Sequence, residues 1–173
     1  MTEPWVVDTN VGVVANDRLD DRPDPPHLPE SISSCVSFLA ELVRSGQVAI
    51  DDSWEIIREY QARMRSSGQP GPGDAFLKWV LVNQANSARC HRVGITDITV
   101  PGRLAGFDPA DGKFIRTALG CPHPRIAEAV DGLWWKCRAD FEAVGIEVNF
   151  LCPEEIKANS DRKHGRDLPG QAS

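Results

Sequence analysis

Four acidic residues occupy positions where carboxylates commonly take part in chemistry. Asp8 and Asp131 each follow an apolar segment that is expected to form a buried strand, whereas Asp111 and Glu59 lie on expected helices. In a parallel α/β sheet, ligands bind beyond the carboxyl ends of the strands. Carboxylates that converge there offer the hard oxygen ligands that Mg²⁺ and Mn²⁺ prefer, and without a cation their like charges raise one another's pKa. The four acids therefore predict a site for Mg²⁺ or Mn²⁺.

Three of these acids also have a purely structural interpretation. Asp8 could cap the helix that follows it. Asp111 could be a favourable negative charge in the first turn of a helix, although Asp108 already supplies the cap of that helix. Asp131 could belong to an ordinary turn with Gly132. The positions of Asp8 and Asp131 after strands favour the functional interpretation of these two acids, and the cap at Asp108 leaves Asp111 free for a functional role.

Glu59 competes with two other glutamates for the remaining acidic position. Glu55 is explained by a capping box with Asp52, the pattern Asp-x-x-Glu at a helix start. Glu41 is explained by a solvated helix face. Glu59 is left without a structural role, so it is the candidate site residue on this helix.

Apolar segments and helical patterns alternate along the chain, which predicts a single α/β domain with a central parallel sheet of about four to five strands flanked by helices. The expected strands are residues 4–7, 47–50, 95–100, 125–130 and 146–150. The expected helices are residues 11–16, 31–45, 52–65, 75–84, 108–119 and 134–143, with Trp54 facing inward. A proline-rich surface loop is expected at residues 17–29 and a flexible connector at residues 66–73.

The composition excludes several classes of protein. A net charge of −6 disfavours a protein that coats nucleic acid by bulk attraction. The five cysteines are scattered, which predicts reduced thiols, and Cys90-His91 and Cys121-Pro122-His123 are too isolated to predict a zinc site. No apolar run is long enough for a bilayer, so we expect a cytoplasmic protein without a membrane partner. A Gly-rich phosphate loop and a Gly-x-Ser-x-Gly elbow are both absent from the sequence, which disfavours P-loop and serine chemistry.

Five short motifs along the chain together resemble those of one family. They are Val6-Val7-Asp8-Thr9-Asn10-Val11, Glu59-Tyr60, Asp111-Gly112-Lys113-Phe114-Ile115-Arg116-Thr117-Ala118, Ala129-Val130-Asp131-Gly132, and Gly145-Ile146-Glu147-Val148 continuing to Cys152-Pro153-Glu154. In their order and separation they are similar to the motifs of PIN-domain ribonucleases, the family that includes the VapC-type toxins. The resemblance covers residues 4–156.

The resemblance implies roles for particular residues. Metal binding and catalysis would fall to the four acids, namely Asp8, Glu59, Asp111 and Asp131. Thr9 and Asn10 would orient the first carboxylate or contact the substrate. Many relatives have a further acid two places after the fourth position, where this chain has Leu133, and this implies weak binding of a second metal ion.

The resemblance also implies how the chain divides into a domain and a tail, and which cofactor, substrate and protein partners it has. We expect a PIN-like nuclease domain at residues 1–156 and a polar, disordered tail at residues 157–173. The implied cofactor is Mg²⁺ or Mn²⁺, and the implied substrate is RNA. An antitoxin protein and a second copy of the chain, in a homodimer, are the implied protein partners.

Three functional hypotheses follow from these residues. The first is a divalent-metal-dependent ribonuclease that hydrolyses RNA phosphodiester bonds, in the role of a toxin or a stand-alone enzyme. The second, favoured by Leu133, is a PIN-like module with weak or no catalysis that binds RNA or protein. The third is a phosphatase with Asp8 as nucleophile, which is disfavoured because Asn10 stands where such enzymes have a second Asp. Trp134-Trp135 is expected to be core and partial surface, with base stacking as the alternative.

Overall fold

The structure is a computed structural model of the chain, and it describes residues 3–17 and 26–165. Its strands are short and all parallel, and they form one sheet in the order β1-β4-β5 and a second in the order β2-β3. The strands are β1 (Val6–Val7), β2 (Val48–Asp51), β3 (Cys90–Val93), β4 (Arg125–Glu128) and β5 (Glu147–Phe150). The two sheets meet at a parallel bridge between Trp5 and Val48, where the Ala49 N–H donates to the Trp5 carbonyl at 2.8 Å. The strands therefore follow one another in the order β3-β2-β1-β4-β5. The α/β class expected from the sequence is confirmed, but the expected single central sheet of four to five strands is divided into a three-stranded and a two-stranded sheet.

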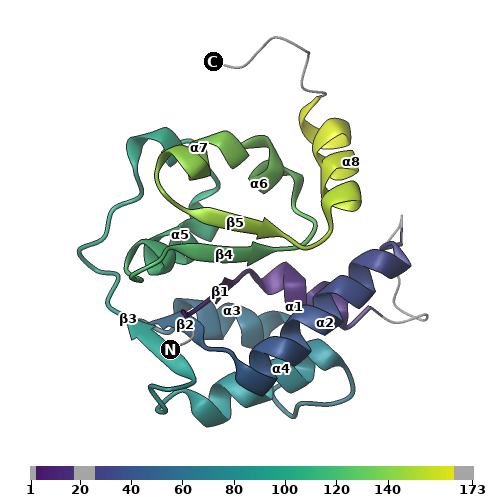
Figure 1. Cartoon of the computed structure of the whole chain (residues 1–173), viewed down its shortest axis with the longest axis vertical. Helices are drawn as coiled ribbons and strands as arrows, with labels where there is room; N and C mark the ends of the chain where they lie inside the picture. Colours follow the sequence, from purple (N-terminus) through teal and green to yellow (C-terminus); the bar gives the residue numbers. More distant parts are fainter. Residues whose placement is uncertain (1–2, 18–25, 166–173) are drawn as a thin grey trace.

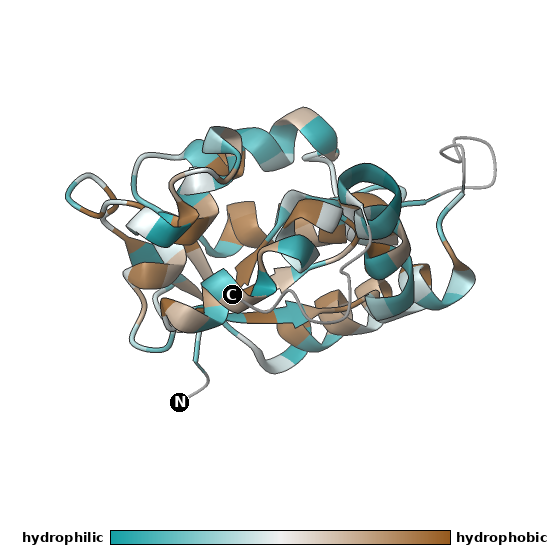
Figure 2. Cartoon of the chain, turned by 90° about the horizontal axis from the view of Figure 1, so that it is seen from above, coloured by the Kyte–Doolittle hydropathy of each residue, from teal (hydrophilic) through white to brown (hydrophobic). Residues whose placement is uncertain are grey.

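Helices lie on both sides of the strands (Figure 1). They are α1 (Thr9–Ala15), α2 (Pro29–Ser45), α3 (Glu55–Arg63), α4 (Pro72–Asn83), α5 (Gly112–Leu119), α6 (Gly132–Lys136), α7 (Arg138–Ala143) and α8 (Pro153–His164), with 3₁₀ turns η1 (Gly102–Leu104) and η2 (Pro109–Asp111). Helices α1, α2 and α4 contact one another, α5 contacts the strands, and α8 contacts α6. Hydrophobic residues are concentrated along the strands and the helix segments beside them (Figure 2). None of the helices in the described part of the chain is both long and apolar enough to cross a bilayer.

The expected strand at residues 95–100 is wrong. The third strand is β3, which pairs with β2 in a register that places Cys90 opposite Val48. Cys90 and Val93 are buried, whereas His91 is half-buried and Arg92 is exposed. A strand at the edge of a sheet is solvated along one side, so β3 does not have the continuous apolar run by which the sequence pattern identifies a strand.

The predicted start of α3 is also wrong in detail. Asp51, and not Asp52, supplies the cap, because its carboxylate accepts hydrogen bonds from the N–H groups of Glu55 and Ile56, each at 2.9 Å. Trp54 has a left-handed backbone with φ of 65° and is 38% exposed, so it does not face inward as expected. The cap position moved by one residue because the carboxylate reaches the helix from the end of β2.

A disordered tail was expected at residues 157–173. This is wrong for residues 157–164, which form the C-terminal part of α8. A Cβ atom at Gly132 would lie 2.5 Å from the Ser160 backbone nitrogen, so the lack of a side chain at Gly132 allows α6 and α8 to approach closely. Asn159 Nδ2 also donates to the Val130 carbonyl at 2.8 Å. These tertiary contacts stabilise a helix whose polar sequence alone suggested disorder. Residues 166–173, and residues 18–25 of the expected proline-rich loop, lie outside the described residues.

Candidate functional site

Asp8 lies at the point where β1 ends and α1 begins. Its N–H donates to the Ala127 carbonyl at 3.0 Å, and its Oδ1 accepts a hydrogen bond from the Asn10 N–H at 2.9 Å. The cap interpretation of Asp8 is therefore correct. The side chain is nevertheless only 3% exposed, and burial raises the pKa of Asp8 from 3.8 to about 6, while the Asn10 N–H opposes that rise. One backbone donor does not offset the loss of water around this carboxylate.

Glu128 is a buried acid that the sequence interpretation missed. It ends β4, is 0% exposed, and its Oε1 accepts a hydrogen bond from the Asp131 N–H at 3.2 Å. Burial, together with the negative charge of Asp8, raises the pKa of Glu128 well above its ordinary value. Its Oε2 is buried and has no donor among the described residues. Because burial and the charge of Asp8 both favour its protonated form, we assign Glu128 as the neutral member of this pair of acids.

A signal for Glu128 was present in the sequence. It stands between Ala127 and Ala129 in a segment that was correctly expected to be a buried strand. Central parallel strands are buried on both faces, and a glutamate is almost never fully buried without a partner. A glutamate within such a strand therefore indicates either a site or an incorrect strand assignment.

Asp131 follows β4 and caps α6. Its side chain accepts a hydrogen bond from the Leu133 N–H at 3.0 Å. Its charge contributes to the raised pKa of both Asp8 and Glu128. The end of β4 therefore lies beside the end of β1, as expected for neighbouring parallel strands.

Asp111 is the last residue of η2 and lies directly before α5. Asp108 caps this segment as predicted, with its Oδ1 accepting from the Ala110 N–H at 2.9 Å, and the Asp111 side chain makes no capping hydrogen bond. Burial raises the pKa of Asp111 from 3.8 to about 7, and the charges of Asp8 and Asp131 add to the rise. Asp111 therefore lies close enough to Asp8 and Asp131 for their negative charges to act on its carboxyl group.

Glu59 reaches this region from α3. The neighbouring Tyr60 is fully buried and donates to the Val7 carbonyl at 2.5 Å, which fixes α3 against β1. Thr9 Oγ1 donates to Glu59 Oε1 at 2.6 Å, and Lys113 Nζ forms an ion pair with Glu59 Oε2. The negative charge of Glu59 also raises the pKa of Asp8. We call the five residues Asp8, Glu59, Asp111, Glu128 and Asp131 the acid cluster.

The acid cluster suits a hard cation in its chemistry. Its members are all carboxyl groups, and burial and neighbouring negative charge raise the pKa of Asp8 and of Asp111, so a cation would stabilise their ionised forms. Across residues 3–17 and 26–165, however, no three His, Cys, Asp or Glu side chains are arranged to hold a metal ion. The donor set thus fits Mg²⁺ or Mn²⁺, and its side chains must rotate to surround one.

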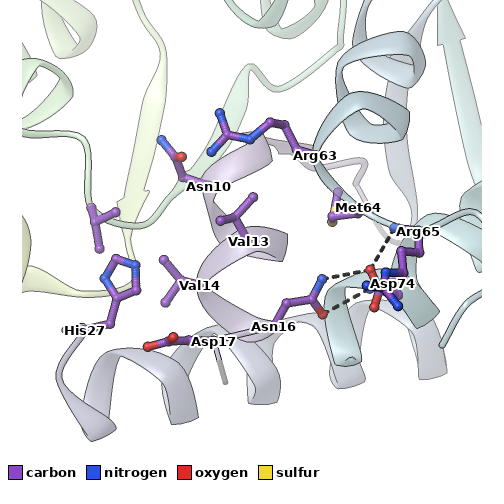
Figure 3. A pocket seen from close by; sticks show the side chains of 11 residues that line it. Asn10, Val13, Val14, Asn16, Asp17, His27, Arg63, Met64, Arg65 and Asp74 are labelled. Atoms are coloured by element: carbon purple, nitrogen blue, oxygen red, sulfur yellow. Dashed lines mark hydrogen bonds between the residues drawn. The ribbon is translucent and has the colours of Figure 1, made fainter. Parts of the chain in front are cut away.

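Two clefts meet beside the acid cluster. Asn10, His27 and Val130 line both of them. The first, with a volume of about 400 Å³, is also lined by Arg63 and Arg65, and Figure 3 shows it with Asn10 and Arg63 beside it. Asn10, which was predicted to contact substrate, therefore lies where the two clefts join.

The second cleft has a volume of about 730 Å³ and includes Asp131 of the acid cluster. Arg162 and Lys163 of α8 line it as well. Cationic side chains therefore lie along both clefts, but acidic ones line them too: Asp17 and Asp74 the first, and Asp131, Glu154 and Glu155 the second. The cationic side chains can contact phosphate groups of a polyanion.

Other candidates from the sequence have structural roles. Trp134 is fully buried and stacks on Phe141, with ring centroids 4.9 Å apart, and the half-buried Trp135 contacts Phe150 edge to face. This confirms the expected core and partial surface. Cys90 and Cys121 are buried thiols.

No protein-family model matches this chain, and no curated protein or solved structure matches it either.

Proposed function

We propose that this protein is a divalent-metal-dependent ribonuclease with a PIN-like fold. The observation that carries the proposal is the electrostatic coupling of Asp8, Asp111 and Asp131, which come from three separate segments of the chain. Asp8 and Asp131 follow the ends of adjacent parallel strands, where α/β proteins bind their ligands. The strand order β3-β2-β1-β4-β5 and the five sequence motifs support the PIN-like assignment.

Asp8, Asp111 and Asp131 are the residues that would hold Mg²⁺ or Mn²⁺. When bound there, the cation would lower the pKa of a water to give the nucleophile and would neutralise the phosphoryl oxygens. Glu128, which is buried beside Asp8, keeps its proton in this proposal and orients the Asp8 carboxylate through their side-chain hydrogen bond. The carboxylates position the cation and need not act as bases.

The flanking clefts supply the binding of RNA. Arg63 and Arg65 on one side, and Arg162 and Lys163 on the other, offer positive charge to successive phosphates. Asn10 lines both clefts and can hydrogen bond to the RNA near the reacting phosphate. The chain as a whole is acidic, so this attraction is confined to the clefts.

A mixed pool of structured and single-stranded RNA, incubated with Mn²⁺, Mg²⁺ or EDTA, tests the proposal. We expect cleavage with metal, none in EDTA, and a loss of roughly a hundredfold or more in Asp8→Asn, because even the partners of metal ligands contribute ten- to hundredfold. The matched control is Asp97→Asn, which makes the same change at an exposed position outside the acid cluster. Equal cleavage by the native chain and Asp8→Asn would contradict the proposal.

A second candidate function is an RNA-binding module without catalysis. The ion pair between Lys113 and Glu59, together with Leu133, favours it, because both reduce the number of carboxylates free for metal. RNA binding in gel-shift assays, with no cutting in either metal, would select this alternative.

A further inference from the structure

Lys113 is an unusually enclosed cation within the acid cluster. It is the second residue of α5, and its side chain is 10% exposed. Besides the ion pair with Glu59, its Nζ donates to the Ala110 carbonyl and lies 4.9 Å from the centroid of the Phe114 ring. Three contacts therefore hold the ammonium group in one place.

Both oxygens of the Glu59 carboxylate are engaged by neighbouring side chains. Oε1 accepts from Thr9 Oγ1 at 2.6 Å, and Oε2 is paired with Lys113 Nζ. A second divalent cation at Glu59 would have to displace the ammonium or lie beside it, and like charges at short range in a partly buried site repel strongly. Glu59 is thus occupied by a cation that the chain itself provides.

We propose that Lys113 is a positioning residue that withholds Glu59 from metal and limits the acid cluster to one divalent ion. The inference rests on the proposed function, since it concerns the same site. Leu133 is consistent with it, because the position two residues after Asp131 also offers no oxygen ligand. The ammonium takes the place that a second metal ion would otherwise fill.

Counting bound Mn²⁺ tests this inference without measuring catalysis. The full chain is titrated with Mn²⁺, and the free ion is followed by its electron paramagnetic resonance signal. We expect one ion per native chain and two per Lys113→Met chain, because the variant keeps the length of the side chain but frees Glu59. Lys113→Arg keeps the charge and is expected to bind one ion.

A double variant shows whether Lys113 acts through Glu59. Lys113→Met combined with Glu59→Gln should return to one ion per chain. Two ions on the native chain, or one ion on a Lys113→Met chain whose circular dichroism is native, would overturn the inference and leave the nuclease proposal standing. A native chain that binds no Mn²⁺ would overturn both.

Glu59→Gln alone keeps the inference testable if Lys113→Met does not fold. Glutamine can still accept the Lys113 hydrogen bond, and Glu59 is not a ligand in the native site under this inference. We therefore expect one bound ion with affinity reduced by less than about tenfold, because removing even a hydrogen-bonded partner of a metal ligand typically costs ten- to hundredfold. A larger loss would identify Glu59 as a ligand and contradict the inference.

Discussion

Asp74 and Asp8 are both buried aspartates, but their surroundings differ. Asp74, in α4, is 4% exposed and accepts hydrogen bonds from Asn16 Nδ2 at 2.9 Å and from the Arg65 N–H at 2.8 Å (Figure 3). It accepts a third from the Gly71 N–H at 3.0 Å. Asp8 is equally buried and accepts one hydrogen bond from a backbone N–H. Donors fixed by the fold stabilise the first carboxylate, whereas the second has too few.

This difference separates an acid that maintains the fold from one that can bind a cation. The carboxylate of Asp74 ties α4 to α1 and to the end of α3, and it needs no further partner. Burial, together with the negative charge of neighbouring acids, raises the pKa of Asp8 and of Asp111. A buried acid with few donors is therefore a better indicator of function than burial alone.

The largest expected effect is a loss of stability in Asp74→Ala. The substitution leaves three donors without their acceptor, and we expect the free energy of unfolding to fall by about 3 kcal/mol. Urea denaturation of the native chain, Asp74→Ala and the exposed control Asp97→Ala would measure it. A change as small as that of the control would show that Asp74 and Asp8 do not differ as described.

Asp8→Asn should raise the free energy of unfolding, the opposite of the effect of Asp74→Ala. In EDTA at neutral pH the rise of the Asp8 pKa from 3.8 to about 6 costs the folded state about 3 kcal/mol. The variant removes this cost but loses about 1 kcal/mol because an amide makes a weaker hydrogen bond with Glu128 than a carboxylate does, so we expect it to be more stable than the native chain by about 2 kcal/mol. Asparagine can still cap α1. The same urea experiment, with Asp97→Asn as control, checks it, and a destabilised Asp8→Asn would mean that its hydrogen bonds outweigh the burial of charge.

The smallest expected effect is a dependence of stability on pH. Asp8 and Asp111 have folded-state pKa values of about 6 and about 7, above the value of 3.8 expected for the unfolded chain. Between pH 3.8 and these folded-state values the folded chain therefore binds more protons than the unfolded chain. Stability is then greatest at the acidic end of this range and falls as the pH rises through 6 and 7.

For Asp8 alone we expect a decrease of about 1 kcal/mol between pH 5 and pH 7 in EDTA. Thermal unfolding followed by circular dichroism would measure it. Saturating Mg²⁺ should reduce the slope, because the cation stabilises the ionised carboxylates. A stability that rises with pH in EDTA would contradict the assigned pKa directions.

The sequence was sufficient to predict features that depend on local pattern. The α/β class and strands β1, β2, β4 and β5 followed from apolar runs, and the acids Asp8 and Asp131 followed from their places after two of those runs. The cap at Asp108 followed from the Asp-Pro pair. Each of these predictions uses information from a few adjacent residues.

Features that depend on distant contacts were missed. The pairing of Lys113 with Glu59 joins two helices that are far apart in sequence, and no local pattern indicates it. Strand β3 lacks an apolar run because it lies at an edge, and α8 is ordered by its contact with Gly132. Glu128 could have been found by asking why an acid stands within a buried strand.

The close approach of α8 to Gly132 has a consequence for the timing of synthesis. Chains generally fold from the N-terminus as they are made. Asp8 is made early, but Asp131, the glycine beside it and the helix that packs on that glycine are made much later. The acids that follow β1 and β4 can therefore come together only after residues 131–164 have been made and have packed against one another.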